Sequence, residues 1–130
     1  MKRAIGAVTF VVRDYDEAIA WFTGALGFQL IADTPLGDGK RWVLVGPETG
    51  SPLLLAKADG AGQTAAIGAQ TGGRVAFFLH SDDFARDHQR MLAAGVRFRE
   101  QPRHEPYGAV AVFEDLYGNL WDLIEPAVDT

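Results

Sequence analysis

The chemistry open to this sequence depends first on one carboxylate, which lies at the end of the last apolar segment. Glu125 closes the alternating segment Leu120 to Glu125, which places its side chain on the same strand face as Trp121. A carboxylate in that position could act as a general base, orient a substrate or bind a metal, so Glu125 is the candidate catalytic residue.

Aromatic and histidine side chains form a second group of candidate binding residues. On strands, such rings could stack on a flat ligand or hold a cation over a ring face. The alternative for each of them is packing in the core. The residues in this group are Trp42, Phe78, His80, His104, Tyr107 and Trp121. Two of them fall in the segment 102–108, which is expected to be a loop, and loops on rigid scaffolds often carry binding groups.

Composition excludes several classes of partner and chemistry. The chain has 130 residues, of which 48% are hydrophobic and 22% charged, enough for one compact domain with a core. Its formal net charge is −5 and its Lys and Arg residues form no basic stripe, so we expect neither a nucleic-acid partner nor a membrane partner. Without cysteine there are no disulfides, thiolate ligands or cysteine nucleophiles. No segment resembles a signal peptide or a membrane span, which favours a cytoplasmic protein.

Hydrophobic periodicity predicts the elements that must position these side chains. It predicts strands over Ile5–Val12, Phe28–Ala32, Arg41–Val45, Leu53–Ala58, Arg74–His80, Val96–Glu100, Ala109–Glu114 and Leu120–Glu125. Helical spacing follows Asp14 as far as Leu26, and follows Asp83 from Phe84 to Ala94. Segments 34–40, 46–52 and 102–108 are expected to be turns or loops, because they are rich in glycine and proline. Segment 59–73 is expected to be a long connection with a short helical turn near Gln63 to Ile67.

The two halves of the chain repeat one another. With a shift of 68 positions, Gly27 aligns with Gly95, Gly50 with Gly118, Leu53 with Trp121, Leu55 with Leu123 and Lys57 with Glu125. This pattern indicates two β-α-β-β-β modules, over about 1–58 and 74–130, joined by the glycine-rich connection of about 59–73. The helix of each module covers one face of its sheet. Two modules could therefore set their free faces together around a concave space.

Segments in both halves carry a family resemblance. Val11 to Phe22, followed by Leu26-Gly27-Phe28, resembles the first module of the vicinal oxygen chelate superfamily, and Ala94 to Phe98 and Asp115 to Trp121 agree with the second. That superfamily includes glyoxalase I, bleomycin-resistance proteins, fosfomycin-resistance enzymes and extradiol dioxygenases. The resemblance implies one α+β domain over 1–130, with a curved, mostly antiparallel eight-stranded sheet around a cup, and a homodimer. It specifies fold more than activity, because one fold can support many chemistries.

The resemblance also implies where metal ligands would lie, since each module of metal-dependent members supplies one from its first strand and one from its last. The equivalent positions are Ala7, Lys57, Arg74 and Glu125. Only the glutamate can bind a divalent cation, and the two positive charges would repel one. We therefore expect no metal and no other cofactor. A relocated metal site formed by His80, His104 and Glu125 is the alternative.

Strand phase predicts which side chains line the cup. They are Thr9, Val11, Leu53, Leu55, Ala76, Phe78, His80, Trp121 and Leu123, with Trp42, His104 and Tyr107 at the rim. For the charged residues two arrangements are open. Either Arg74 or Lys57 forms an internal ion pair with Glu125, or the three form an open site for an anionic ligand.

Three functions are consistent with these observations. The first is a bleomycin-resistance-like protein that binds a small organic molecule in its cup, without the divalent metal and without turnover. The second is a metal-free isomerase or lyase acting on a small carbonyl or carboxylate compound, with Glu125 beside Arg74 or Lys57. The third is a metal-dependent glyoxalase or dioxygenase. The missing metal donors and the aromatic side chains on strands favour the first.

Overall fold

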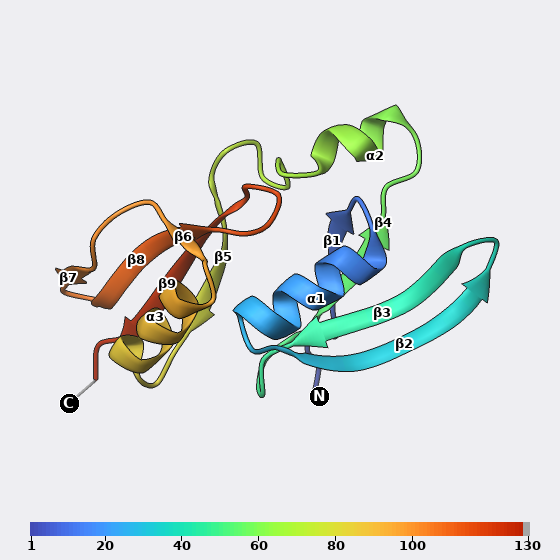
Figure 1. Cartoon of the computed structure of the whole chain (residues 1–130). Coiled ribbons are helices and arrows are strands. Elements are labelled where there is room, and N and C mark those ends of the chain that lie inside the picture. The colour runs from blue at the N-terminus through green and yellow to red at the C-terminus, as the bar shows by residue number, and fades with distance from the viewer. Residues whose placement is uncertain (129–130) are drawn as a thin grey trace. The chain divides into compact units, whose positions relative to one another are not determined.

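The chain forms two compact units, and the computed structural model describes residues 1–128 of it. The first unit is Met1–Ile67 and the second begins at Gly68. Each unit is built on its own sheet (Figure 1). Asp129 and Thr130, the last residues of the predicted second module, lie outside the described residues.

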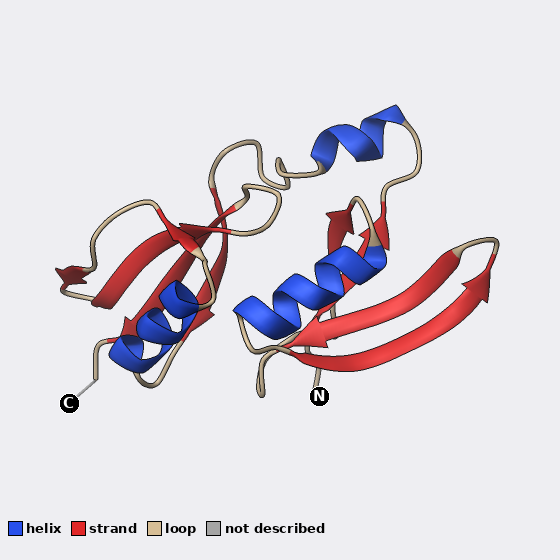
Figure 2. Ribbon diagram, viewed as in Figure 1, coloured by secondary structure: helices blue, strands red, loops and turns tan. Residues whose placement is uncertain are grey.

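The first unit has its strands in the order β1-β4-β3-β2. Its elements are β1 (Val8–Val12), α1 (Tyr15–Ala25), β2 (Gln29–Gly37), β3 (Lys40–Gly46), β4 (Leu53–Lys57) and α2 (Ala61–Ala66). The β1–β4 pair is parallel, and the β4–β3 and β3–β2 pairs are antiparallel. The sheet is therefore mixed, and α1 lies across one of its faces (Figure 2).

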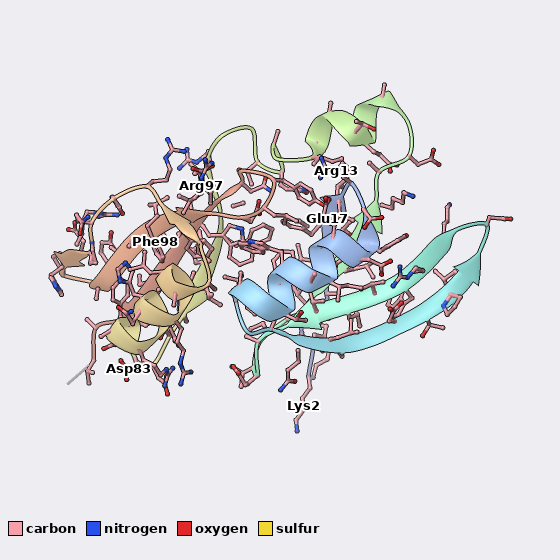
Figure 3. All side chains as sticks on the ribbon, in the orientation of Figure 1. Lys2, Arg13, Glu17, Asp83, Arg97 and Phe98 are labelled. Atoms are coloured by element: carbon pink, nitrogen blue, oxygen red, sulfur yellow. The ribbon has the colours of Figure 1, made fainter. Side chains whose placement is uncertain are left out.

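Helix α1 begins where the sequence predicts, directly after Asp14. The Asp14 carboxylate accepts a hydrogen bond from the Glu17 N–H at 2.8 Å, which satisfies one of the donors that a helix N-terminus leaves unpaired. Arg13 and Glu17 form an ion pair beside this turn (Figure 3). The buried side of α1 contributes Phe22, whose ring packs edge-on against Phe10 of β1 at 5.3 Å between centroids. This contact is part of the core between α1 and the sheet.

The second unit has its strands in the order β5-β9-β8-β6, with β7 also paired to β8. Its elements are β5 (Val75–His80), α3 (Phe84–Ala93), β6 (Arg97–Phe98), β7 (Arg103–Glu105), β8 (Gly108–Glu114) and β9 (Leu120–Pro126). The β5–β9 pair is parallel and the others are antiparallel. Asp83 caps α3 by accepting a hydrogen bond from the Arg86 N–H at 3.1 Å (Figure 3).

The repeat that the sequence predicts is confirmed by strand register and by backbone conformation. Val43 pairs with Leu55 as Ala111 pairs with Leu123, and Val45 pairs with Leu53 as Phe113 pairs with Trp121, each with the shift of 68. Gly50 and Gly118 have φ angles of 87° and 91°, a region that glycine enters without steric cost. The two modules therefore share their last hairpin in detail.

Several sequence expectations need correction. The expected single eight-stranded sheet is two mixed sheets, and one of them contains the additional strand β7 within the predicted loop 102–108. The turn predicted over 34–40 is shorter in the structure. Strand β2 continues to Gly37, and only Asp38 and Gly39 form the turn. The short helical turn in the connection is α2, which starts two residues earlier than predicted. No helix among residues 1–128 is long and apolar enough to cross a membrane.

Candidate functional site

The two faces of the second sheet differ in what covers them. On the face covered by α3, the Phe77 and Trp121 ring centroids lie 4.5 Å apart, and those of Phe113 and Trp121 lie 5.6 Å apart. Within residues 68–128, α3 is the only helix, so no helix of this unit covers the other face. We call that other side of the sheet the open face. It carries Phe78, His80, Val112 and Asp122.

Trp121 belongs to the core and not to the side that strand phase predicted. Its side chain is 3% exposed, and its indole N–H donates to the Asp115 carboxylate at 2.9 Å. Leu123 is fully buried on the same side. Alternation within one strand gives the phase of that strand only. The β5–β9 register, in which Phe78 stands beside Asp122, decides which residues of two strands share a face.

Glu125 also lies on the helix side of the sheet. Its Oε1 accepts a hydrogen bond from the backbone N–H of Phe84 at 2.7 Å, in the first turn of α3. That N–H is one of the donors that a helix N-terminus leaves without a partner, and negative charge there is stabilised by the helix dipole. The contact gives Glu125 a structural role. Its predicted role as a catalytic base stays a prediction.

An ion pair between Arg74 and Glu125, one of the arrangements that the sequence left open, does not form in this structure. Strands β5 and β9 are parallel and Val75 pairs with Leu120, so Arg74 lies near the start of both strands and Glu125 near the end of β9. The five-residue separation between Leu120 and Glu125 spans about 16 Å along a strand. Arg74 and Lys57 are both exposed, and neither forms an ion pair with a residue in the range 1–128.

The carboxylate on the open face is Asp122, which the sequence analysis did not single out. It stands between Phe78 of β5 and Val112 of β8, away from the edges of the sheet. Its Oδ1 atom is shielded from solvent and has no hydrogen-bond partner among the described residues. The sequence does contain a signal for this residue. If Trp121 and Leu123 are core residues, alternation must place Asp122 on the opposite face.

An arginine is held among polar side chains near Asp122. The Arg103 Nε donates to Glu100 at 3.0 Å, and its Nη1 donates to Glu105 at 2.9 Å and to the Tyr107 hydroxyl at 3.5 Å. The β7–β8 register places Arg103 on the open face. Glu100 also accepts a hydrogen bond from a backbone N–H of β8 at 3.0 Å. We call Glu100, Arg103, Glu105 and Asp122 the charged cluster.

The charged cluster carries an excess of negative charge. Burial raises the pKa of Asp122 above its ordinary value, the Arg103 guanidinium lowers it, and the Glu100 carboxylate raises it. The hydrogen bonds that Arg103 donates to Tyr107, Glu105 and Glu100 raise the pKa of its guanidinium, which therefore stays charged. Three carboxylates face one guanidinium. The charged cluster can therefore accept hydrogen bonds from donors and attract cations more readily than anions.

The candidates in the first unit divide between the two faces of its sheet. Trp42 is 44% exposed and lies with Leu44 on the face opposite α1. Lys57 pairs with Val12 at the far end of β4, on the face that α1 covers. The expectation that Leu53 and Leu55 line the cup is wrong. Both are buried in the core, and their neighbours Leu54 and Ala56 take the opposite face, together with Thr9 and Val11.

The alternative metal site that uses two histidines and Glu125 does not assemble. His80 is on the open face, where it pairs with Ile124. His104 pairs with Ala109, which in turn pairs with Glu125, so these two candidates lie on the opposite face. The relocated metal site of His80, His104 and Glu125 is therefore wrong. Tyr107 is 51% exposed in the turn between β7 and β8, where its hydroxyl reaches the charged cluster.

The four positions at which the resemblance places metal ligands do not fit a divalent cation. Ala7 offers no donor atom, and Lys57 and Arg74 are exposed cations. The fourth position, Glu125, is engaged by the first turn of α3. Among residues 1–128, no three His, Asp or Glu side chains form a group that could hold a metal ion.

Comparison with known proteins gives matches along nearly the whole chain. A model of the glyoxalase/bleomycin resistance protein/dioxygenase superfamily matches residues 4–123. An uncharacterized protein of Shewanella frigidimarina is 51% identical over 128 residues, which cover 96% of this chain and 95% of that protein. The solved structure of UcmS2 has a TM-score of 0.82 at 31% identity, covering 96% of this chain and 99% of its own. TnmS3, an antibiotic binding protein from Streptomyces sp. CB03234, has a TM-score of 0.73 at 27% identity, covering 98% of both chains.

Proposed function

Because the chain belongs to the glyoxalase/bleomycin resistance protein/dioxygenase superfamily, we propose that it binds a small organic molecule without chemical turnover. The site is the cup that the family resemblance implies, and binding does not use the divalent metal of the metal-dependent members. We also propose that the working form is a homodimer. The antibiotic-binding function of TnmS3, a structure similar over 98% of this chain, supports ligand binding as the activity.

The observation that carries this proposal is the exposure of a large aromatic side chain on the face of each sheet opposite its long helix, α1 or α3. Phe78 is 62% exposed on the open face, and Trp42 is 44% exposed on the face opposite α1. Leaving such rings in water forgoes the free energy that their burial would give, about 1.5–3 kcal/mol for a Phe side chain. Exposed rings on rigid strands are suited to stacking on a flat ligand. A planar aromatic compound is therefore the expected ligand class.

A metal-free isomerase or lyase has less support. That mechanism placed Glu125 as a base beside Arg74, and the parallel β5–β9 pair separates these residues. Glu125 already accepts the backbone N–H of Phe84. The residues at the four metal positions also do not favour metal chemistry of the glyoxalase or dioxygenase type.

The proposal is tested by isothermal titration calorimetry with planar probes of different charge, in the presence of excess chelator. Acridine is neutral near neutral pH, 9-aminoacridine is cationic and anthracene-9-carboxylate is anionic. Binding of at least one probe in the submillimolar range, with the compound recovered unchanged by mass spectrometry, supports the proposal. Absence of binding to every probe and to a wider panel of flat antibiotics contradicts it.

Two variants locate the binding site in this experiment. Phe78→Ala is expected to weaken binding about tenfold, since truncation of a central aromatic contact commonly costs more than 1 kcal/mol. Leu92→Ala is the matched control, because Leu92 is exposed on α3, on the helix side of the same sheet. Equal affinities for the two variants would place the ligand elsewhere. Light scattering during chromatography tests the homodimer, and a monomeric mass would contradict it.

A further inference from the structure

We propose that Asp122 is the polar anchor of the ligand site, and that it selects a planar aromatic ligand bearing a cationic nitrogen. Phe78, the neighbour of Asp122 across the β5–β9 pair, supplies the ring surface. The inference rests on the proposed function, since it names the class of ligand bound there. It has three supports: the internal repeat, the hydrogen bonding of Asp122, and the charges around it.

The internal repeat identifies Asp122 as a departure from the module's own architecture. Asp122 pairs with Val112 on β8, and the equivalent pair in the first unit joins Leu54 to Leu44, with the same shift of 68. The first unit therefore has an apolar side chain, Leu54, at the position that Asp122 occupies in the second unit. Burying a carboxylate without a hydrogen-bond partner costs free energy, so folding alone does not explain an aspartate in the middle of the second sheet.

The hydrogen bonding of Asp122 is incomplete in a way that a ligand could complete. Its Oδ1 is buried and has no partner among the described residues. Native structures pair nearly all buried polar atoms, so an unpaired one indicates a missing partner. The nearby cation does not fill this role, because Arg103 is used by Glu100, Glu105 and Tyr107. Asp122 as a whole is half-buried, so a donor group brought by the ligand can approach its carboxylate and supply the missing partner.

The surrounding charge favours a cation as that donor. The charged cluster contains three carboxylates and one guanidinium, and the carboxylate of Glu100 acts electrostatically on Asp122. A ligand ammonium or protonated ring nitrogen would form a charge-assisted hydrogen bond with Asp122, which is stronger than a neutral one. An anionic ligand would meet repulsion. The exposed ring of Phe78, about 5 Å away across the strand pair, would stack on the ligand's aromatic part.

The test compares two probes of nearly the same shape, 9-aminoacridine as the cation and acridine as the neutral compound, by calorimetry near neutral pH. The wild-type protein is expected to bind 9-aminoacridine at least about tenfold more tightly than acridine. Asp122→Asn should remove this preference while leaving acridine binding within about twofold. Asp38→Asn removes the same charge from an exposed turn of the first unit and should leave both affinities unchanged.

Further measurements keep the inference separable from the proposed function. Asp122→Leu, which installs the residue type of Leu54, should stay folded by circular dichroism and also lose the preference, so misfolding of Asp122→Asn would not leave the question open. Phe78→Ala should weaken both probes alike. If wild type binds acridine as tightly as 9-aminoacridine, or if Asp122→Asn keeps the preference, the inference is overturned and small-molecule binding stands. If neither probe binds, the inference is overturned and the wider panel decides the proposed function.

Discussion

The Glu125 carboxylate accepts a hydrogen bond from the backbone N–H of Phe84 at 2.7 Å, and so joins the end of β9 to the start of α3. These residues are 41 positions apart in the chain. The contact places the most conspicuous carboxylate of the last strand on the helix side of its sheet. Asp122, three residues earlier, is the carboxylate left on the open face. The candidate site therefore depends on the phase of β9.

The first prediction concerns this helix contact. Glu125→Ala should lower the free energy of unfolding by about 1 kcal/mol, within the range for loss of a helix N-terminal cap. Glu125→Gln keeps an acceptor oxygen and should cost less. Urea unfolding followed by circular dichroism measures both, with Glu48→Gln as an exposed control. Unchanged stability combined with lost ligand binding would instead place Glu125 in the ligand site.

The second prediction concerns the stability cost of Asp122. Asp122→Leu should raise the free energy of unfolding by about 1 kcal/mol or more, because it removes a buried polar atom without a partner and adds apolar burial. Residues kept for binding often lower stability in this way. The midpoint of urea unfolding measures the change. A less stable variant would mean that Asp122 has a stabilising partner.

The third prediction is that the amount by which Asp122 lowers the free energy of unfolding depends on pH. Burial raises the pKa of Asp122 in the folded protein, so the folded state binds the proton more tightly than the unfolded state does. The group is neutral in both states below its unfolded pKa of about 3.9, and no cost arises there. As pH rises through the raised folded pKa, the cost of ionising the buried group develops fully.

The difference in unfolding free energy between Asp122→Asn and wild type should therefore grow from acidic toward neutral pH. Measuring the difference between the two proteins cancels the titration of their shared groups. A difference that shrinks over this range would show that the folded protein favours the ionised form of Asp122.

The fourth prediction concerns the segment that leads into the second sheet. Gly68 has a φ of 76°, and a Cβ there would lie 2.3 Å from the Tyr117 carbonyl oxygen. Gly68→Ala should destabilise the protein by about 2 kcal/mol or more, from backbone strain and from the displaced turn. Gly62→Ala in α2 is the matched control, because its Cβ would meet no atom within 4 Å. Thermal unfolding that gives equal midpoints for the two variants would contradict this packing.

Much of the fold follows from local signals in the sequence. Asp14 and Asp83 begin helices because their short carboxylates can accept from N–H groups three residues ahead, and such caps are visible in the sequence. The repeat is equally visible, since glycines such as Gly50 and Gly118 keep the same backbone conformation in both halves. Strand β7 was missed because only three residues form it, and tertiary pairing with β8 holds them.

The site was harder to predict, because it depends on how strands pair. Phe78 and Asp122 share a face through a parallel register that includes an irregularity between Val75 and Phe77, and no local pattern specifies it. A one-residue shift of that register would move Trp121 from the core to the open face. Strand phase alone led to the same wrong placement, because it put Trp121 on the face that carries Phe78. Burial shows which face of β9 points to the core. The large ring of Trp121 is buried there, so Asp122 lies on the other face.

We propose above that this chain binds a small planar molecule without a metal. The most direct test is calorimetric titration of the wild-type protein with 9-aminoacridine in excess chelator, beside metal analysis of the same sample. We expect submillimolar binding that the chelator does not change, with the probe recovered intact. Binding that disappears with chelator and returns with a stoichiometric divalent metal would contradict it.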